Sequence, residues 1–259
     1  LAARVEKPIS VRGLFYRVTS SAPHLIDKTE SGYRKVQQRV LHLRRSGQMP
    51  YGWISDGTRL RLKPTTWDNV DECLSAVSAS YRRNMWIDCP DHVEIWAEKD
   101  AIRGVVYPVT HDWDVPLLIA RGYASETFIH ATAAEITASG KQRAFIYQLG
   151  DHDPSGVGAW NDVQTKMRGF VPSHIELHFE QITEWDLPTR PTKSSDTRSK
   201  NFVGESVEVD AVETPLLRRL LEDAILTHLD ENVLELHEQY EAQERAFLTS
   251  SLGGGRVQR

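Results

Sequence analysis

The chain has 259 residues, of which 40% are hydrophobic and 26% charged, a composition typical of a globular protein with one large or two ordinary domains. No apolar run approaches the roughly 20 residues that cross a bilayer, and the N-terminal residues lack the apolar core of a signal peptide, so we expect a cytoplasmic protein with no membrane contact. The net charge of −5 is unevenly spread, because residues 1–63 hold 13 Lys and Arg against 4 Asp and Glu, whereas the remainder holds 18 against 32.

This charge asymmetry is typical of a DNA-binding part joined to a part rich in carboxylates. A solvated basic helix would give the same composition, so the charge alone leaves both interpretations open. Cys73 and Cys89 are too few for a disulfide framework or a cysteine metal site, which fits a reducing compartment.

Two helices and a hairpin are predicted in the basic part. Ser10 is the expected cap of a helix over 8–20, and a second helix over 33–47 has an apolar stripe with basic residues on its other faces. An Asp-Gly dipeptide within 50–63 indicates a hairpin. The order of a helix, a basic helix and a hairpin predicts a winged helix, in which the second helix would enter the major groove of DNA. The residues expected to contact DNA are Arg34, Lys35, Arg39, Arg44, Arg45, Arg59 and Arg61.

Strands and helices alternate in the acidic part, which predicts a mainly parallel sheet flanked by helices. A helix over 65–83, capped by Thr66, precedes a domain boundary near residue 88. The expected strands are 93–97, 116–120, 143–149 and 174–182, and the expected helices are 99–107, 124–138, 157–168 and a tail helix over 214–248. We therefore expect an α/β protein with two domains, 1–88 and 89–259.

The segment 185–214 is rich in Pro, Ser and Thr and carries basic residues. It is either a surface loop or a loop that lies along a DNA backbone or docks a second subunit. In the second case Arg190, Lys193 and Arg198 would contact phosphates.

Two of the predicted strands deliver acidic residues at their C-terminal ends. One is followed by Glu98, and another by Asp151 and Asp153. Because ligands bind outside the carboxyl ends of parallel strands, we expect the three carboxylates to converge there. They repel one another unless a cation neutralises them, and an all-oxygen set suits Mg²⁺ or Mn²⁺. Alternatively, Glu98 is a helix N-terminal charge and the Asp-x-Asp segment is merely a turn.

The first helix offers a nucleophile. Arg12 and Tyr16 form an (i, i+4) pair, so they share one helical face. A tyrosine hydroxyl, with a pKa near 10, is a poor nucleophile unless a cation or a metal favours its oxyanion. Arg12 can stabilise that oxyanion or bind a phosphate. The alternative is that Tyr16 is a half-buried core aromatic beside Phe15.

In this order, the segments resemble the A subunit of topoisomerase VI and its relative, the meiotic double-strand-break protein. Those proteins join a winged-helix domain with a catalytic tyrosine to a Toprim domain. Their motifs Arg-x-Ile-[Tyr/Phe]-Tyr, Glu-Lys, Gly-Tyr/Phe-Pro and Asp-x-Asp-Pro-x-Gly are matched by 12-RGLFY-16, Glu98-Lys99, loosely by 122-GYAS-125, and by 151-DHDPSG-156. The resemblance covers roughly residues 8–185 and is nearest to the short, stand-alone versions of bacteria and phages.

Two residues depart from the pattern of the family. His152 stands where larger relatives carry a small or acidic residue, and Gly13 replaces an acidic residue often seen after the motif arginine. The chain also contains no ATPase module of its own, so strand passage is not implied.

The resemblance implies a DNA-cleaving transesterase of the type IIB topoisomerase kind, in the isomerase class. Tyr16 of each protomer in a homodimer would attack double-stranded DNA and form a 5′-phosphotyrosyl link. Arg12 and Lys99 would steady the phosphate, and Mg²⁺ or Mn²⁺ would be held by the three carboxylates of the other protomer. An ATP-binding B-type subunit and a bacterial or phage-encoded, nucleoid-associated location are also implied. Two alternatives remain: a DNA-binding protein with a catalytically idle Toprim fold, and a metal-dependent hydrolytic nuclease that does not use Tyr16.

Overall fold

The computed structural model describes residues 7–55, 63–181 and 208–253. The chain forms two compact units that are interleaved along the sequence. The first unit comprises Leu1–Arg59 and Pro90–Ile225, and the second comprises Leu60–Cys89 and Leu226–Arg259. Each unit thus combines two separated stretches, an arrangement that hydrophobic periodicity does not reveal.

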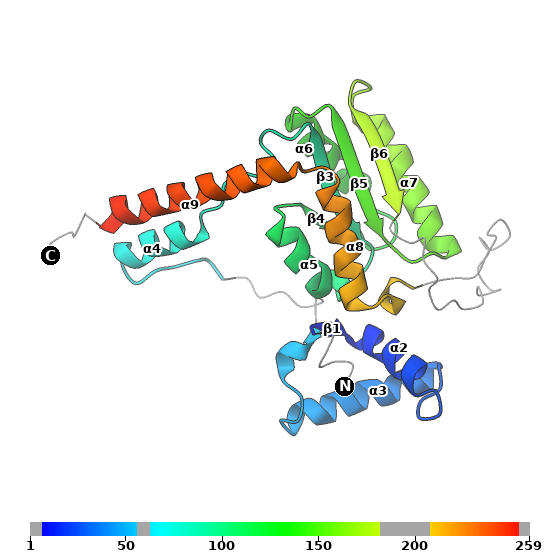
Figure 1. Cartoon of the computed structure of the whole chain (residues 1–259). Coiled ribbons are helices and arrows are strands. Elements are labelled where there is room, and N and C mark those ends of the chain that lie inside the picture. The colour runs from blue at the N-terminus through cyan, green and yellow to red at the C-terminus, as the bar shows by residue number, and fades with distance from the viewer. Residues whose placement is uncertain (1–6, 56–62, 182–207, 254–259) are drawn as a thin grey trace. The chain divides into compact units, whose positions relative to one another are not determined.

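The first unit is built on a four-stranded parallel sheet with the strand order β4-β3-β5-β6 (Figure 1). The strands are β3 (Asp91–Ala97), β4 (Leu117–Ile119), β5 (Arg143–Leu149) and β6 (Glu176–Gln181). The two central strands are buried, and Ile95 and Leu149 are fully inaccessible. The predicted α/β architecture with a parallel sheet is therefore confirmed.

Helices cover both faces of this sheet (Figure 1). They are α5 (Arg103–Asp112), α6 (Glu126–Ala138), α7 (Pro154–Phe170) and α8 (Thr214–Leu226). The 3₁₀ helix η2 (Asp100–Ile102) precedes α5, and η4 (Val209–Ala211) precedes α8. Trp96 of β3 lies in one buried core cluster with Ile129 of α6 and Met167 of α7. Burial of a large apolar side chain such as Ile129 or Met167 stabilises the fold by roughly 1.5–3 kcal/mol. On the other side, α8 is tied to α5 because Arg218 Nε donates to the carbonyl of Val105 at 2.9 Å.

The N-terminal part of the first unit contains two helices and a short pair of strands. The elements are β1 (Ile9–Ser10), α2 (Val11–Ser21), α3 (Glu30–Arg45), η1 (Tyr51–Trp53) and β2 (Ile54–Ser55). As predicted, Ser10 caps α2, since its Oγ accepts from Gly13 N at 2.9 Å. Of the apolar residues on α3, Val36 and Val40 are buried, whereas Leu41 is exposed.

The predicted hairpin over 50–63 is described only in its first half. There β2 pairs in parallel with β1. The Asp-Gly turn, Arg59 and Arg61 lie outside the described residues, as do Arg190, Lys193 and Arg198. The winged helix therefore stays a prediction.

The second unit pairs α4 (Val70–Ser80) with α9 (Glu231–Gly253). The hydroxyl of Tyr81 donates to Glu244 Oε2 at 2.7 Å across this pair. The predicted cap Thr66 is wrong: α4 begins later, where Asn69 Oδ1 accepts from Glu72 N at 2.8 Å.

Other helix bounds also differ from the prediction, and the two largest differences are in the tail and in the helix after β3. The tail is not one helix over 214–248, because Asp230 Oδ1 accepts from Asn232 N at 2.8 Å and starts α9 as a separate helix. The helix expected over 99–107 begins at Arg103, after a 3₁₀ turn, and continues through Pro108. Of the helices that the structure describes, none has the length and apolarity needed to cross a bilayer.

Candidate active site

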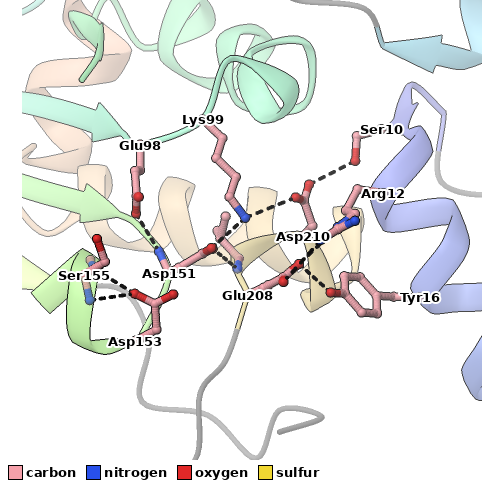
Figure 2. Close-up of polar contacts among 12 residues, drawn as sticks. Ser10, Arg12, Tyr16, Glu98, Lys99, Asp151, Asp153, Ser155, Glu208 and Asp210 are labelled. Carbon is pink, nitrogen blue, oxygen red and sulfur yellow. Dashed lines mark hydrogen bonds and ion pairs between the residues drawn. The ribbon is translucent and has the colours of Figure 1, made fainter. Parts of the chain in front are cut away.

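The three predicted carboxylates lie at the C-terminal ends of β3 and β5 (Figure 2). Glu98 follows β3, and its Oε2 accepts from the backbone N–H of Asp151 at 3.0 Å, just after β5. Asp153 caps α7, since its Oδ1 accepts from the backbone N–H groups of Ser155 at 3.0 Å and Gly156 at 2.8 Å. The parallel register thus delivers all three residues to one edge of the sheet.

Two of the carboxyl groups at this edge have raised pKa values. Burial, together with the charges of Asp151 and Asp153, raises the pKa of Glu98 above its usual value. Burial also raises the pKa of Asp151, although the ammonium of Lys99 opposes the shift.

The chemistry of these donors fits a divalent cation. All of them are carboxylate oxygens, the ligands that Mg²⁺ and Mn²⁺ prefer. Within the described ranges, no three or more His, Cys, Asp or Glu side chains already form a metal-binding group. Glu98, Asp151 and Asp153 are the residues that would hold the ion, and Asp153 Oδ2 takes no part in the helix cap.

Lys99 supplies the positive charge at the sheet edge. Its Nζ lies 2.7 Å from Asp151 Oδ2 and 3.5 Å from Asp210 Oδ2. Burial lowers the pKa of Lys99, but the charges of Asp151 and Asp210 outweigh burial and raise it. Lys99 therefore stays protonated and points into the site.

Tyr16 and Arg12 converge on one carboxylate, that of Glu208. The hydroxyl of Tyr16, a residue only 6% exposed, donates to Glu208 Oε2. Arg12 Nε lies 3.2 Å from the same oxygen. The ring of Tyr16 does pack beside Phe15, with centroids 5.5 Å apart, but its hydroxyl belongs to a polar site.

The segment Glu208–Ala211 joins the tyrosine helix to the sheet edge, and sequence reasoning missed it. Val209 N donates to Asp151 Oδ1 at 3.0 Å, while the hydroxyl of Ser10 donates to Asp210 Oδ1 at 3.0 Å (Figure 2). The sequence signal was the alternation of acidic and apolar residues in 208-EVDAV-212, after a stretch rich in Ser and Thr.

Glu208 is ionised despite its burial. Burial alone would raise its pKa, but the hydrogen bond from Tyr16 and the charges of Lys99 and Arg12 lower it below the usual value. In turn, although burial lowers the pKa of Arg12, its hydrogen bond and charge interaction with Glu208 raise it overall. A Cβ on Gly13 would make an ordinary contact of 3.5 Å with the carbonyl oxygen of Asp210 and a tighter one of 3.2 Å with Ile9 Cγ1.

The basic residues predicted to contact DNA are mostly exposed on α3. Arg34, Lys35, Arg39 and Arg45 are accessible. Arg44 is half-buried, and its guanidinium lies 4.3 Å from the ring centroid of Tyr51. The structure therefore presents four of the five predicted residues of this helix to solvent.

Comparison of the chain with protein-family models, with curated proteins and with solved structures gave no match.

Proposed function

We propose that this chain is a DNA-cleaving transesterase of the topoisomerase VI A type, with Tyr16 as its nucleophile. The supporting observation is that Tyr16 and Arg12 of α2 share one polar network with Lys99 and Asp151 at the sheet edge. A tyrosine that served only the core would need neither this arginine nor a link to the carboxylate edge.

The reaction exchanges one phosphoester for another. The Tyr16 oxygen bonds to a backbone phosphorus, the bond from phosphorus to the 3′ oxygen breaks, and a 5′-phosphotyrosyl link forms. The phenolic proton goes to solvent, and the released 3′ oxygen takes up a proton. Arg12 and Lys99, both held charged, would bind the phosphate oxygens. Glu98, Asp151 and Asp153 would hold Mg²⁺ or Mn²⁺, which would supply electrostatic stabilisation of the negative charge that develops on the phosphate.

Duplex DNA would lie against α3 in this proposal. The exposed basic residues of α3 provide affinity that is largely independent of DNA sequence and falls with salt. A winged-helix arrangement of the N-terminal part, a homodimer over the DNA and an ATP-binding B-type subunit complete the proposal.

A covalent-adduct assay tests the proposal. Labelled duplex DNA is incubated with the protein in Mg²⁺ or Mn²⁺ and quenched with detergent, and protein-linked DNA is measured. The adduct is expected to vanish in Tyr16→Phe and in EDTA but to persist in Tyr33→Phe, a matched change on α3. Cleavage that survives Tyr16→Phe would identify a hydrolytic nuclease, and salt-sensitive binding without cleavage would identify an idle Toprim fold.

A further inference from the structure

The carboxylate of Glu208 sits where an anion is bound by several cationic and hydroxyl donors. Arg12 approaches both of its oxygens, with Nε 3.2 Å from Oε2 and Nη2 3.5 Å from Oε1. The Tyr16 hydroxyl donates to Oε2, and the charge of Lys99 adds to the stabilisation. A forked guanidinium with further donors is the usual way in which proteins bind phosphate as well as carboxylate.

These donors are also the groups that the proposed reaction assigns to the scissile phosphate. Arg12 and Lys99 would bind its oxygens, and Tyr16 would attack its phosphorus. Because Glu208 is only 4% exposed and engages these groups, a phosphodiester and this carboxylate compete for the same donors.

Hydrogen bonds hold the backbone beside Glu208 in place. Val209 N donates to Asp151 Oδ1, and the hydroxyl of Ser10 donates to Asp210 Oδ1. Arg17 Nη2 donates to the carbonyl of Ala211 at 2.6 Å. Tyr16 is consequently covered, although a nucleophile must reach DNA.

We propose that Glu208 is an internal phosphate mimic and that the segment Glu208–Ala211 is an autoinhibitory element, which must leave before a DNA phosphate can reach Tyr16. The identity of the displaced ligand as a DNA phosphate rests on the proposed function. The existence of an anion subsite between Arg12 and Tyr16 does not.

The subsite is tested by adding inorganic phosphate to the whole 259-residue chain. Glu208→Ala removes the carboxylate that Arg12 and Tyr16 bind, so phosphate should bind in its place and stabilise the variant. With phosphate about a hundredfold above its dissociation constant, the Tm should rise by roughly 5–10 °C relative to chloride at equal ionic strength. The parent chain and Glu213→Ala should show no such rise, because Glu213 is exposed and pairs with Arg17 rather than Tyr16.

A phosphate response in Glu208→Ala that equals that of Glu213→Ala would overturn the proposal. If Glu208→Ala does not fold, Glu208→Gln keeps the volume without the charge and should still respond more strongly than the parent; an equal response again contradicts the proposal. This readout needs no cleavage, so its failure is distinct from failure of the proposed function.

The same variants separate inhibition from catalysis. An autoinhibitory carboxylate predicts that Glu208→Gln raises the yield of the DNA–protein adduct about tenfold. If Glu208 instead accepted the proton of Tyr16 during the reaction, the yield would fall, and that result would refute the inhibitory role.

Discussion

Gly156→Ala is predicted to disrupt the sheet edge because the first turn of α7 lies against the strand that precedes it. A Cβ on Gly156 would be 2.2 Å from the carbonyl oxygen of Asp151 and 3.4 Å from Glu98 Oε2. The carbonyl belongs to the backbone and cannot rotate away, so α7 or the end of β5 must shift by about 1 Å to restore an ordinary contact.

The expected cost follows from this overlap. Overpacking in a well-packed region costs about 1–3 kcal/mol, and a clash with backbone belongs at the upper end. For a chain of this size, a loss of about 3 kcal/mol lowers the Tm by roughly 6–12 °C. The shift would also separate Asp151 from Glu98, so the proposed stabilisation by Mg²⁺ should be weakened as well.

Gly169→Ala in the same helix is the matched control. A Cβ on Gly169 meets nothing within 4 Å, so alanine should be neutral or stabilising by up to about 1 kcal/mol. Thermal unfolding of both variants, with and without Mg²⁺, makes the comparison. Equal Tm values would refute the close approach of α7 to Asp151.

Three further outcomes are expected. Glu208→Gln should cost about 2 kcal/mol at pH 7. Because the folded state lowers the pKa of Glu208, the stability is present above its unfolded pKa of about 4.3 and is lost as pH falls through the folded value, so the Tm gap should close in acid. Asp153→Asn should keep the cap of α7 but lose the rise in Tm on adding Mg²⁺, whereas Asp153→Ala should lose both, with a cap loss of about 1 kcal/mol. Arg39→Glu should weaken duplex binding and reduce its salt dependence by about one phosphate contact in a salt titration, whereas Arg219→Glu, on α8, should change neither.

The sheet and its acidic edge were predictable because local pattern and fold agree there. Apolar runs bounded by polar turns predicted the two central strands, β3 and β5. Because these strands are parallel neighbours, the residues that follow them, Glu98 and Asp151, lie at the same edge of the sheet. The (i, i+4) spacing of Arg12 and Tyr16 likewise predicted that they share one helical face, and in the structure both contact Glu208.

That partner was not predictable, because Glu208 comes 192 residues after Tyr16 and acts through tertiary contacts. The misplaced cap of α4 and the break before α9 have a different cause. In both, a side chain capable of capping, Asn69 or Asp230, competed with helical continuation, and apolar periodicity does not weigh that competition.

Mapping the DNA–protein linkage to a residue tests the central claim most directly. After cleavage in Mn²⁺, nuclease digestion and proteolysis, mass spectrometry should find a nucleotide joined through its 5′ phosphate to the peptide that contains Tyr16. The link should be absent in Asp151→Ala, which removes a carboxylate of the sheet edge. A nucleotide joined to another residue, or cleaved DNA with no linked peptide, would contradict the assignment of Tyr16 as the nucleophile.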